Sequence, residues 1–201
     1  MVDLLILLPA AGRSARMGGQ DKLLMPVDGE PLLRRQVRAA LATGQRVLAT
    51  LPRGRATARA AALAGLAGPL TIAEIDAEEG MAASLRAGAK AAQAAHAAGL
   101  MVMLPDMPEI GASHVARLAR AFAEVPERPL RATDMAGIPG HPAILPARLF
   151  PALAGLRGDA GARALLQREN VRLIPLAGRA AITDLDTPAD WAAWQSRQQQ
   201  G

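Results

Sequence analysis

The sequence predicts an α/β protein built on a mostly parallel open sheet flanked by helices. Apolar runs typical of strands alternate with helical segments through the first two-thirds of the 201 residues. The first run, residues 3–8, is apolar at every position after Asp3, as in a strand buried on both faces. Glycine or proline stands between most of these segments, where turns are expected.

The elements of the first half follow in order from these signals. After a segment rich in glycine and arginine, a helix is expected from about Pro31 to Thr43, because Pro31 suits a first helical turn and Gly44 a helix end. Strand and helix then alternate as a strand at 46–51, an alanine-rich helix to about Leu66, a strand at 70–75, a helix at 81–99 closed by Gly99, a strand at 100–104 and a helix at 112–123.

After one more expected strand at 129–133, strands and helices alternate less regularly. A Gly- and Pro-rich turn at 137–142 precedes a short strand, "AIL". The remaining expected elements are helices near 146–153 and 160–168, a strand at 171–176 and a last helix opened by Thr187-Pro188. We expect one domain over residues 1–201, with a frayed tail at 196–201.

The composition excludes several classes of function. The chain is 51% hydrophobic with a net charge of +5, and its basic residues are spread along the sequence. Aromatic residues make up only 2%, which leaves little for stacking on bases, so nucleic-acid binding is not expected. The absence of cysteine excludes disulfides and thiolate chemistry. No apolar stretch has membrane-spanning length, so we expect a cytoplasmic protein that binds no membrane.

The segment after the first strand, "PAAGRSARMGGQDK", has the composition of a phosphate-binding loop. Ala10, Ala11 and Gly12 let the backbone approach a ligand, and exposed amides there can bind phosphate oxygens. Arg16 and Lys22 supply the positive charge that a triphosphate requires. The alternative is a flexible glycine loop with solvated arginines, since neither GK[ST] nor GxGxxG is present.

Two aspartates are candidate metal ligands. Asp106 follows a buried strand and stands in "PDMP", and Asp186 lies in "TDLDTPAD" near the C-terminus. Mg²⁺ usually takes one or two carboxylates together with substrate phosphates. Asp106 could equally be a proline-turn residue, and Asp186 could simply precede a helix. Only their meeting in space would make them a metal pair.

Taken jointly, these segments resemble the MobA-like nucleotidyltransferases, and most closely the molybdenum cofactor cytidylyltransferases. The segments that carry the resemblance are "PAAGRSARMGGQDK" (9–22), "EGMAASL" (79–85), "PDMP" (105–108), "GHPAIL" (140–145), "GDAGAR" (158–163) and "DLDTPAD" (184–190). They occur in the family's order and span nearly the whole chain. Pro9 and Pro105 replace an aliphatic residue and a glycine that are usual in the family.

The resemblance implies a Rossmann-like nucleotidyltransferase fold and Mg²⁺-dependent transfer of CMP from CTP to molybdopterin, with release of pyrophosphate. Roles carried over by position are nucleotide contact for Ala10, Ala11 and Gly12, catalysis for Arg16, Lys22 and Asp106, metal binding for Asp106 and Asp186, and contact with the nucleotide or the pterin acceptor for Ser84, His141 and Asp159. A molybdoenzyme or its maturation chaperone is an implied partner.

Three alternatives stay open. The spacer "GGQDK" is one residue longer than in many cytidylyltransferases and is similar to that of the guanylyltransferase branch, whereas Ala11 and the "GHP" segment favour the cytidylyl branch. The acceptor could instead be a sugar phosphate or methylerythritol phosphate, because acceptor contacts come from variable loops. A third possibility is an inactive nucleotide- or pterin-binding accessory protein for molybdoenzyme maturation, against which the retention of Lys22, Asp106 and Asp186 argues.

Overall fold

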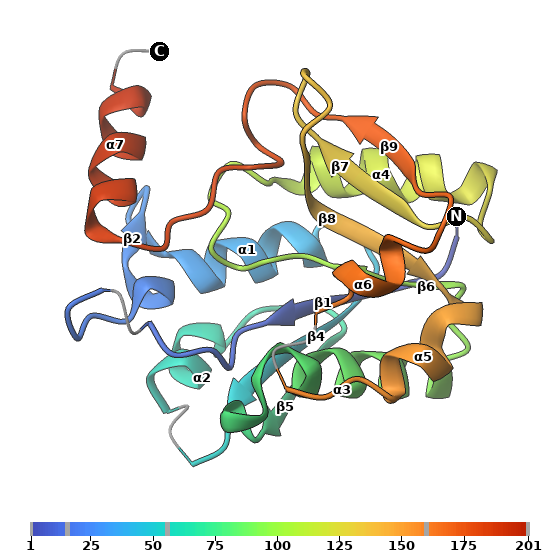
Figure 1. Cartoon of the computed structure of the whole chain (residues 1–201). Helices are drawn as coiled ribbons and strands as arrows, with labels where there is room; N and C mark the ends of the chain where they lie inside the picture. Colours follow the sequence, from blue (N-terminus) through green and yellow to red (C-terminus); the bar gives the residue numbers. More distant parts are fainter. Residues whose placement is uncertain (1, 15–16, 55–56, 159–160, 200–201) are drawn as a thin grey trace.

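A single mixed sheet forms the centre of the computed structural model, which describes residues 2–14, 17–54, 57–158 and 161–199 (Figure 1). Its strand order is β5-β4-β1-β6-β8-β7-β9. The strands are β1 (Leu4–Pro9), β4 (Arg46–Pro52), β5 (Leu70–Ile75), β6 (Gly99–Val102), β7 (Leu130–Thr133), β8 (Pro139–Pro146) and β9 (Arg172–Pro175). Only β8 runs antiparallel to its neighbours β6 and β7, and the other pairings are parallel. The predicted fold class is confirmed.

Helices cover both faces of the sheet (Figure 1). One face packs against α1 (Leu32–Leu41), α2 (Thr57–Leu63) and α4 (Ala112–Glu124), and the other against α3 (Gly80–Ala94), α5 (Phe150–Ala154) and α6 (Arg163–Leu166). Alternate residues of β1 serve the two layers, since Ile6 faces the first and Leu7 the second. Each fully buried aliphatic side chain contributes about 1.5–3 kcal/mol of burial free energy, which explains the unbroken apolar run.

The parallel strands bring their carboxyl ends to one edge of the sheet. There β1 leads into the segment from Ala10 to Lys22, and β6 leads toward Asp106. β4 and β5 end at the same edge, before Arg53 and Asp76. Because ligands of open α/β sheets bind beyond this edge, the predicted site segments lie on the expected side of the protein.

A small hairpin precedes α1 and was not predicted. β2 (Pro26–Val27) and β3 (Glu30–Pro31) pair antiparallel around Asp28 and Gly29, which both have positive φ. Asp-Gly is a strong signal for such a two-residue turn, so the sequence did contain the information. The helix expected from about Pro31 is α1, which begins at Leu32, directly after Pro31 at the end of β3.

The prediction that Gly99 closes the third helix is wrong. α3 ends at Ala94, and His96 takes a left-handed conformation with φ +52°. The amide of Ala98 then donates to the carbonyl of Asp3, and Gly99 begins β6. Alanine favours helix throughout this stretch, so pairing with the sheet, and not local propensity, decides where the helix ends.

The segment 137–142, predicted to be a turn, is largely strand. β8 begins at Pro139 because the segment around Ala181 lies directly against it: a Cβ on Gly140 would be 1.6 Å from the carbonyl oxygen of Ala181. The amide of His141 donates to that same oxygen at 2.8 Å. Glycine is therefore required at position 140 for the close approach of two backbones.

The C-terminal helix α7 (Pro188–Gln198) packs beside the β2–β3 hairpin (Figure 1). Trp191 and Trp194 join Met17, Val27 and Leu32 in a separate apolar cluster. The helix continues past Ser196, into the segment expected to be frayed. Among the helices of the described residues, none is long and apolar enough to span a membrane.

Candidate active site

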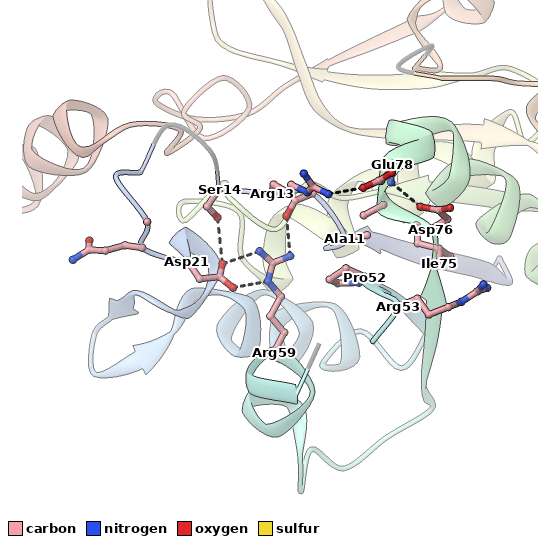
Figure 2. Close-up of a pocket in the computed structure, with 14 residues that line it drawn as sticks. Ala11, Arg13, Ser14, Asp21, Pro52, Arg53, Arg59, Ile75, Asp76 and Glu78 are labelled. Carbon is pink, nitrogen blue, oxygen red and sulfur yellow. Dashed lines mark hydrogen bonds and ion pairs between the residues drawn. The ribbon is translucent and has the colours of Figure 1, made fainter. Parts of the chain in front are cut away.

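The loop after β1 is held by one buried arginine. Arg59, from α2, donates to both carboxylate oxygens of Asp21 at 2.7 and 2.8 Å and to the carbonyls of Ala10 and Gly12 at 2.5 and 3.0 Å. Ser14 donates to Asp21 and accepts from the amide of Lys22. Figure 2 shows Arg59 reaching Asp21 beneath the loop. Both ends of the loop are thereby joined to the same guanidinium.

Sequence reasoning missed Arg59. It stands in an alanine-rich segment with no motif, and no role was predicted for it. Its side chain is only 8% exposed, whereas an arginine with no partner would be solvated. The sequence signal that could have pointed to it is weak: a lone cation on an otherwise apolar helix, opposite Asp21 in the loop.

Replacing Arg59 with leucine is expected to lower the free energy of unfolding by about 3 kcal/mol, because it leaves Asp21 and two loop carbonyls without their donor. Urea denaturation followed by circular dichroism measures this. Arg35→Leu is the matched control, since the Arg35–Asp28 pair is exposed and is worth less than about 1 kcal/mol. Equal losses in both variants would show that Arg59 has no special role in the loop.

Lys22 lies between two carboxylates from distant parts of the chain. Its Nζ is 2.6 Å from Asp106 Oδ2 and 2.6 Å from Asp186 Oδ1. Asp21 caps the short 3₁₀-helix Lys22–Leu24, which fixes the start of the lysine side chain. The three side chains are 15%, 17% and 26% exposed, so they face a partly enclosed space. The structure therefore brings the two predicted metal ligands together, on either side of a predicted phosphate-binding residue.

Backbone pairing places Asp186 there. The amide of Leu185 donates to the carbonyl of Asp106 at 3.0 Å, so the two aspartates belong to adjoining chain segments. Thr187 then caps α7 in a capping box with Asp190, whose carboxylate also accepts from the amide of Asp186. The interpretation of Asp186 as a residue just ahead of a helix is thus also correct.

The charges of this cluster are strongly coupled. Burial disfavours the charge on Lys22, but the charges of Asp106 and Asp186 and their hydrogen bonds outweigh it, so the pKa of the ammonium is raised above its usual value. Among the described residues, Asp106 Oδ1 is buried without a hydrogen-bond partner. A buried carboxylate oxygen with no donor suits a cation, so the donor set fits a divalent metal.

The described residues offer no group of three or more His, Asp or Glu side chains placed to hold a metal. A structural metal centre built from protein ligands alone would need such a group. Two carboxylates are, however, the number that Mg²⁺ commonly takes when substrate phosphates complete its coordination. The arrangement fits a metal that enters with a phosphorylated ligand.

Two adjoining cavities open at this edge of the sheet. The triad cavity, of about 640 Å³, is lined by Lys22, Asp106 and Asp186 together with the loop and α3. The loop cavity, of about 580 Å³, lies on the other side of Gly12 and Arg13 and reaches Arg53 and Asp76 at the ends of β4 and β5 (Figure 2). The residues shared by both cavities are Ala11, Gly12, Arg13, Ser14, Ala77 and Glu78.

Besides His141, the other predicted site residues divide into three groups. Ala11, Gly12 and Ser84 line the triad cavity, with Ser84 accepting a hydrogen bond from Thr50. Ala10 lines neither cavity: its amide donates to Thr50 and its carbonyl accepts from Arg59. Predicted residues that lie outside the described part of the chain are Arg16 and Asp159.

His141 lines a third cavity, which shares Met81 and Leu104 with the triad cavity. Burial and the charge of Arg131 outweigh a backbone hydrogen bond to Val102 and the charge of Asp106, and they lower the pKa of His141 to about 4. Its Nδ1 is buried without a partner among the described residues. The histidine expected in a turn thus lies on β8, with a neutral ring and a buried Nδ1.

His141 is expected to stay neutral down to about pH 5 and to titrate near pH 4. Since its folded pKa lies below the unfolded value of 6.5, the unfolded chain takes up the proton first, and stability falls as the pH drops from 6.5 toward 4. NMR of the ring carbon-bound protons measures the midpoint. A midpoint above about pH 6 would contradict the buried, neutral environment.

Comparison with protein families and with known proteins finds relatives of this chain. The family model of the MobA-like NTP transferase domain matches residues 6–173. Purine catabolism protein PucB of Bacillus subtilis (strain 168) is 28% identical over 196 residues, covering 90% of this chain and 91% of PucB.

Several solved structures also match this chain over most of its length. The crystal structure of Rv0371c from Mycobacterium tuberculosis H37Rv has a TM-score of 0.77 at 30% identity, with 96% of each chain covered. Rv0371c in complex with manganese has a TM-score of 0.76 at 26% identity, covering 96% of this chain and 97% of the other. The 4-diphosphocytidyl-2C-methyl-D-erythritol synthase of Anaerococcus prevotii DSM 20548 shares the fold, with a TM-score of 0.76 at 11% identity and coverage of 98% and 96%.

Proposed function

The chain belongs to the MobA-like NTP transferase family, and from this premise we propose that it transfers CMP from CTP to the molybdenum cofactor, with Mg²⁺ and with release of pyrophosphate. The observation that carries the proposal is the position of Lys22, whose ammonium is 2.6 Å from each of the carboxylates of Asp106 and Asp186. These groups line a cavity together with the small residues Ala11 and Gly12. The cavity thus combines the charges that phosphate transfer requires with a backbone that a ligand can approach closely.

The chain's own contribution is alignment and charge. In-line displacement at phosphorus asks mainly for positioned reactants and for neutralisation of phosphate oxygens. Lys22 remains fully charged in its site and supplies a compact point charge to the triphosphate. Asp106 and Asp186 would hold the divalent cation, which would add positive charge beside the phosphate oxygens. Arg59 joins the two ends of the loop and would hold it in place beside the phosphates.

The two adjoining cavities suit the two ends of a nucleotide. The triad cavity contains the charged groups that phosphates require. The loop cavity, which reaches Arg53 and Asp76, has room for the base and ribose on the other side of Gly12. A nucleotide lying across the loop would therefore have its phosphates at Lys22 and its base at the ends of β4 and β5.

The choice of CTP rests on the sequence. Ala11 and the "GHP" segment of β8 resemble the cytidylyl branch, and the long spacer before Lys22 supports GTP as the second candidate. The acceptor is proposed to be a phosphorylated pterin, and a molybdoenzyme or its maturation chaperone to be the partner that receives the product. The arrangement of Lys22, Asp106 and Asp186 supports catalysis over an accessory role, because mere binding would not require all three.

A thermal-shift panel with CTP, GTP, ATP and UTP, each with Mg²⁺, tests the nucleotide. CTP is expected to stabilise most, since a ligand of the folded state stabilises by mass action. Each nucleotide is then incubated with molybdenum cofactor, a sugar phosphate or methylerythritol phosphate, and pyrophosphate is measured. Pyrophosphate release with GTP would move the assignment to the guanylyl branch, and turnover with a sugar phosphate would replace the acceptor. No release with any pair would overturn the proposed activity.

A further inference from the structure

A third cavity, of about 280 Å³, adjoins the triad cavity; Met81 and Leu104 line both. We call it the arginine cavity. Its walls come from α3, from β6, β7 and β8, and from α6 and the residues just before it. Most of the lining is apolar, contributed by Met81, Leu85, Val102, Leu104, Ala143, Leu145, Ala162 and Leu166. Its polar groups are therefore few and specific, as in cavities that bind small molecules.

Two of these polar groups are arginines. Arg131 on β7 donates from Nε to the carbonyl of Gly140 at 2.7 Å, which fixes the direction of its guanidinium. Arg163, at the start of α6, lines the same cavity. Burial and the nearby charge of Arg163 lower the pKa of Arg131. Neither arginine forms an ion pair with a carboxylate of the described residues, although the described chain pairs many other arginines in this way. Two neighbouring guanidinium groups that have no carboxylate partner among the described residues suit a shared anion.

The third polar group is His141. Its ring is neutral, and the hydrogen bond with the Val102 backbone favours the protonated ring, so the ring donates there. Nδ1 then keeps its lone pair, and it is buried without a partner among the described residues. A donor N–H or O–H on a ligand would satisfy it. His141 lines the arginine cavity, so this unmet acceptor and the two unpaired cations are presented to one space.

We propose that the arginine cavity is the acceptor subsite, and that it takes a compact, largely apolar ring system bearing an anionic group for Arg131 and Arg163 and an N–H or O–H donor for His141. This rests on the proposed function, because the cavity adjoins the one that contains Lys22. The acceptor's reacting phosphate lies toward Met81 and Leu104, at the wall shared with the triad cavity. The anionic group at the arginines is a second one, and it holds the far end of the acceptor.

Phenyl phosphate is the probe for this subsite, because it carries an anion on a small apolar ring. His141 reports its position: the chain has three histidines, so His96→Gln and His114→Gln assign the ring signals. The probe is expected to shift the His141 signal saturably, and to do so equally in the presence of CTP and Mg²⁺. Arg163→Gln and Arg131→Gln are each expected to weaken probe binding at least about tenfold.

Arg117→Gln is the matched control, since it removes an exposed arginine from α4 on the opposite face of the sheet. It should leave probe binding unchanged. Arg163 is exposed on a short helix, so its variant tests the subsite even if Arg131→Gln fails to fold.

Three results would overturn the inference: an unmoved His141 signal, a shift abolished by CTP, or an Arg117→Gln loss equal to that of Arg163→Gln. CTP stabilisation is measured in the same samples. If CTP binds and the probe does not, only the subsite fails; if the probe binds and no nucleotide does, the proposed function fails and the anion site stands.

Discussion

Replacing Lys22 with alanine is expected to slow nucleotidyl transfer by roughly 100- to 1,000-fold, the usual cost of removing one positioned group that stabilises transition-state charge. Lys22 is half-buried between Asp106 and Asp186 and carries a raised pKa, so it is charged throughout the working pH range. Lys22→Arg is not expected to restore the rate, because the planar guanidinium cannot take the place of a compact ammonium between two oxygens.

Steady-state pyrophosphate release measures the effect, and the second of the chain's two lysines supplies the control. Lys90 is exposed on α3, and Lys90→Ala should keep the wild-type rate. Binding of Mn²⁺ to the carboxylates is expected to persist in Lys22→Ala, because the variant removes a competing cation from between them. A Lys22→Ala enzyme that is folded and turns over at the Lys90→Ala rate would contradict the role given to Lys22.

Replacing either aspartate with asparagine is expected to reduce turnover by about 1,000-fold or more, since charge stabilisation by a bound metal is worth several kcal/mol. Asp106→Asn removes the carboxylate whose Oδ1 is buried without a partner, and Asp186→Asn removes the one supplied by the C-terminal segment. Both changes keep the shape of the side chain. Unlike Lys22→Ala, each should also weaken Mn²⁺ binding.

Electron paramagnetic resonance of free Mn²⁺, measured with and without CTP, separates metal binding from the rate. Asp3→Asn is the control, because Asp3 is an exposed carboxylate at the opposite end of β1. It should change neither quantity. Mn²⁺ binding of wild-type strength in Asp106→Asn and Asp186→Asn would remove these residues from the metal site.

The sequence predicted those parts of the protein that local pattern specifies. The apolar run of β1 and the order of strands and helices follow from burial on both faces of a sheet. Lys22, Asp106 and Asp186 were identified because each stands in a recognisable motif. Their meeting could not be derived from spacing, because it depends on the hydrogen bond from Leu185 to Asp106 across the fold.

The features that sequence reasoning missed depend on contacts between distant segments. Arg59 lies in an alanine-rich helix that contains no motif. Its role depends on the packing of α2 under the loop. The first half of β8 was predicted to be part of a turn because the segment is rich in glycine and proline, and only "AIL" was predicted to be strand. Position 140 is glycine because the backbone of Ala181 lies directly against it. The end of α3 is likewise set by the pairing of Ala98 with Asp3.

The most direct test of the central claim follows the two ends of the triphosphate in one reaction. The full chain is incubated with Mg²⁺, molybdenum cofactor and CTP labelled with ³²P at either the α- or the γ-phosphorus. The account predicts that the α-label appears on the acceptor and the γ-label in pyrophosphate, and that Asp106→Asn and Lys22→Ala slow both by the factors given above. Recovery of the α-label in free CMP or in unreacted CTP alone, with no labelled acceptor, would contradict it.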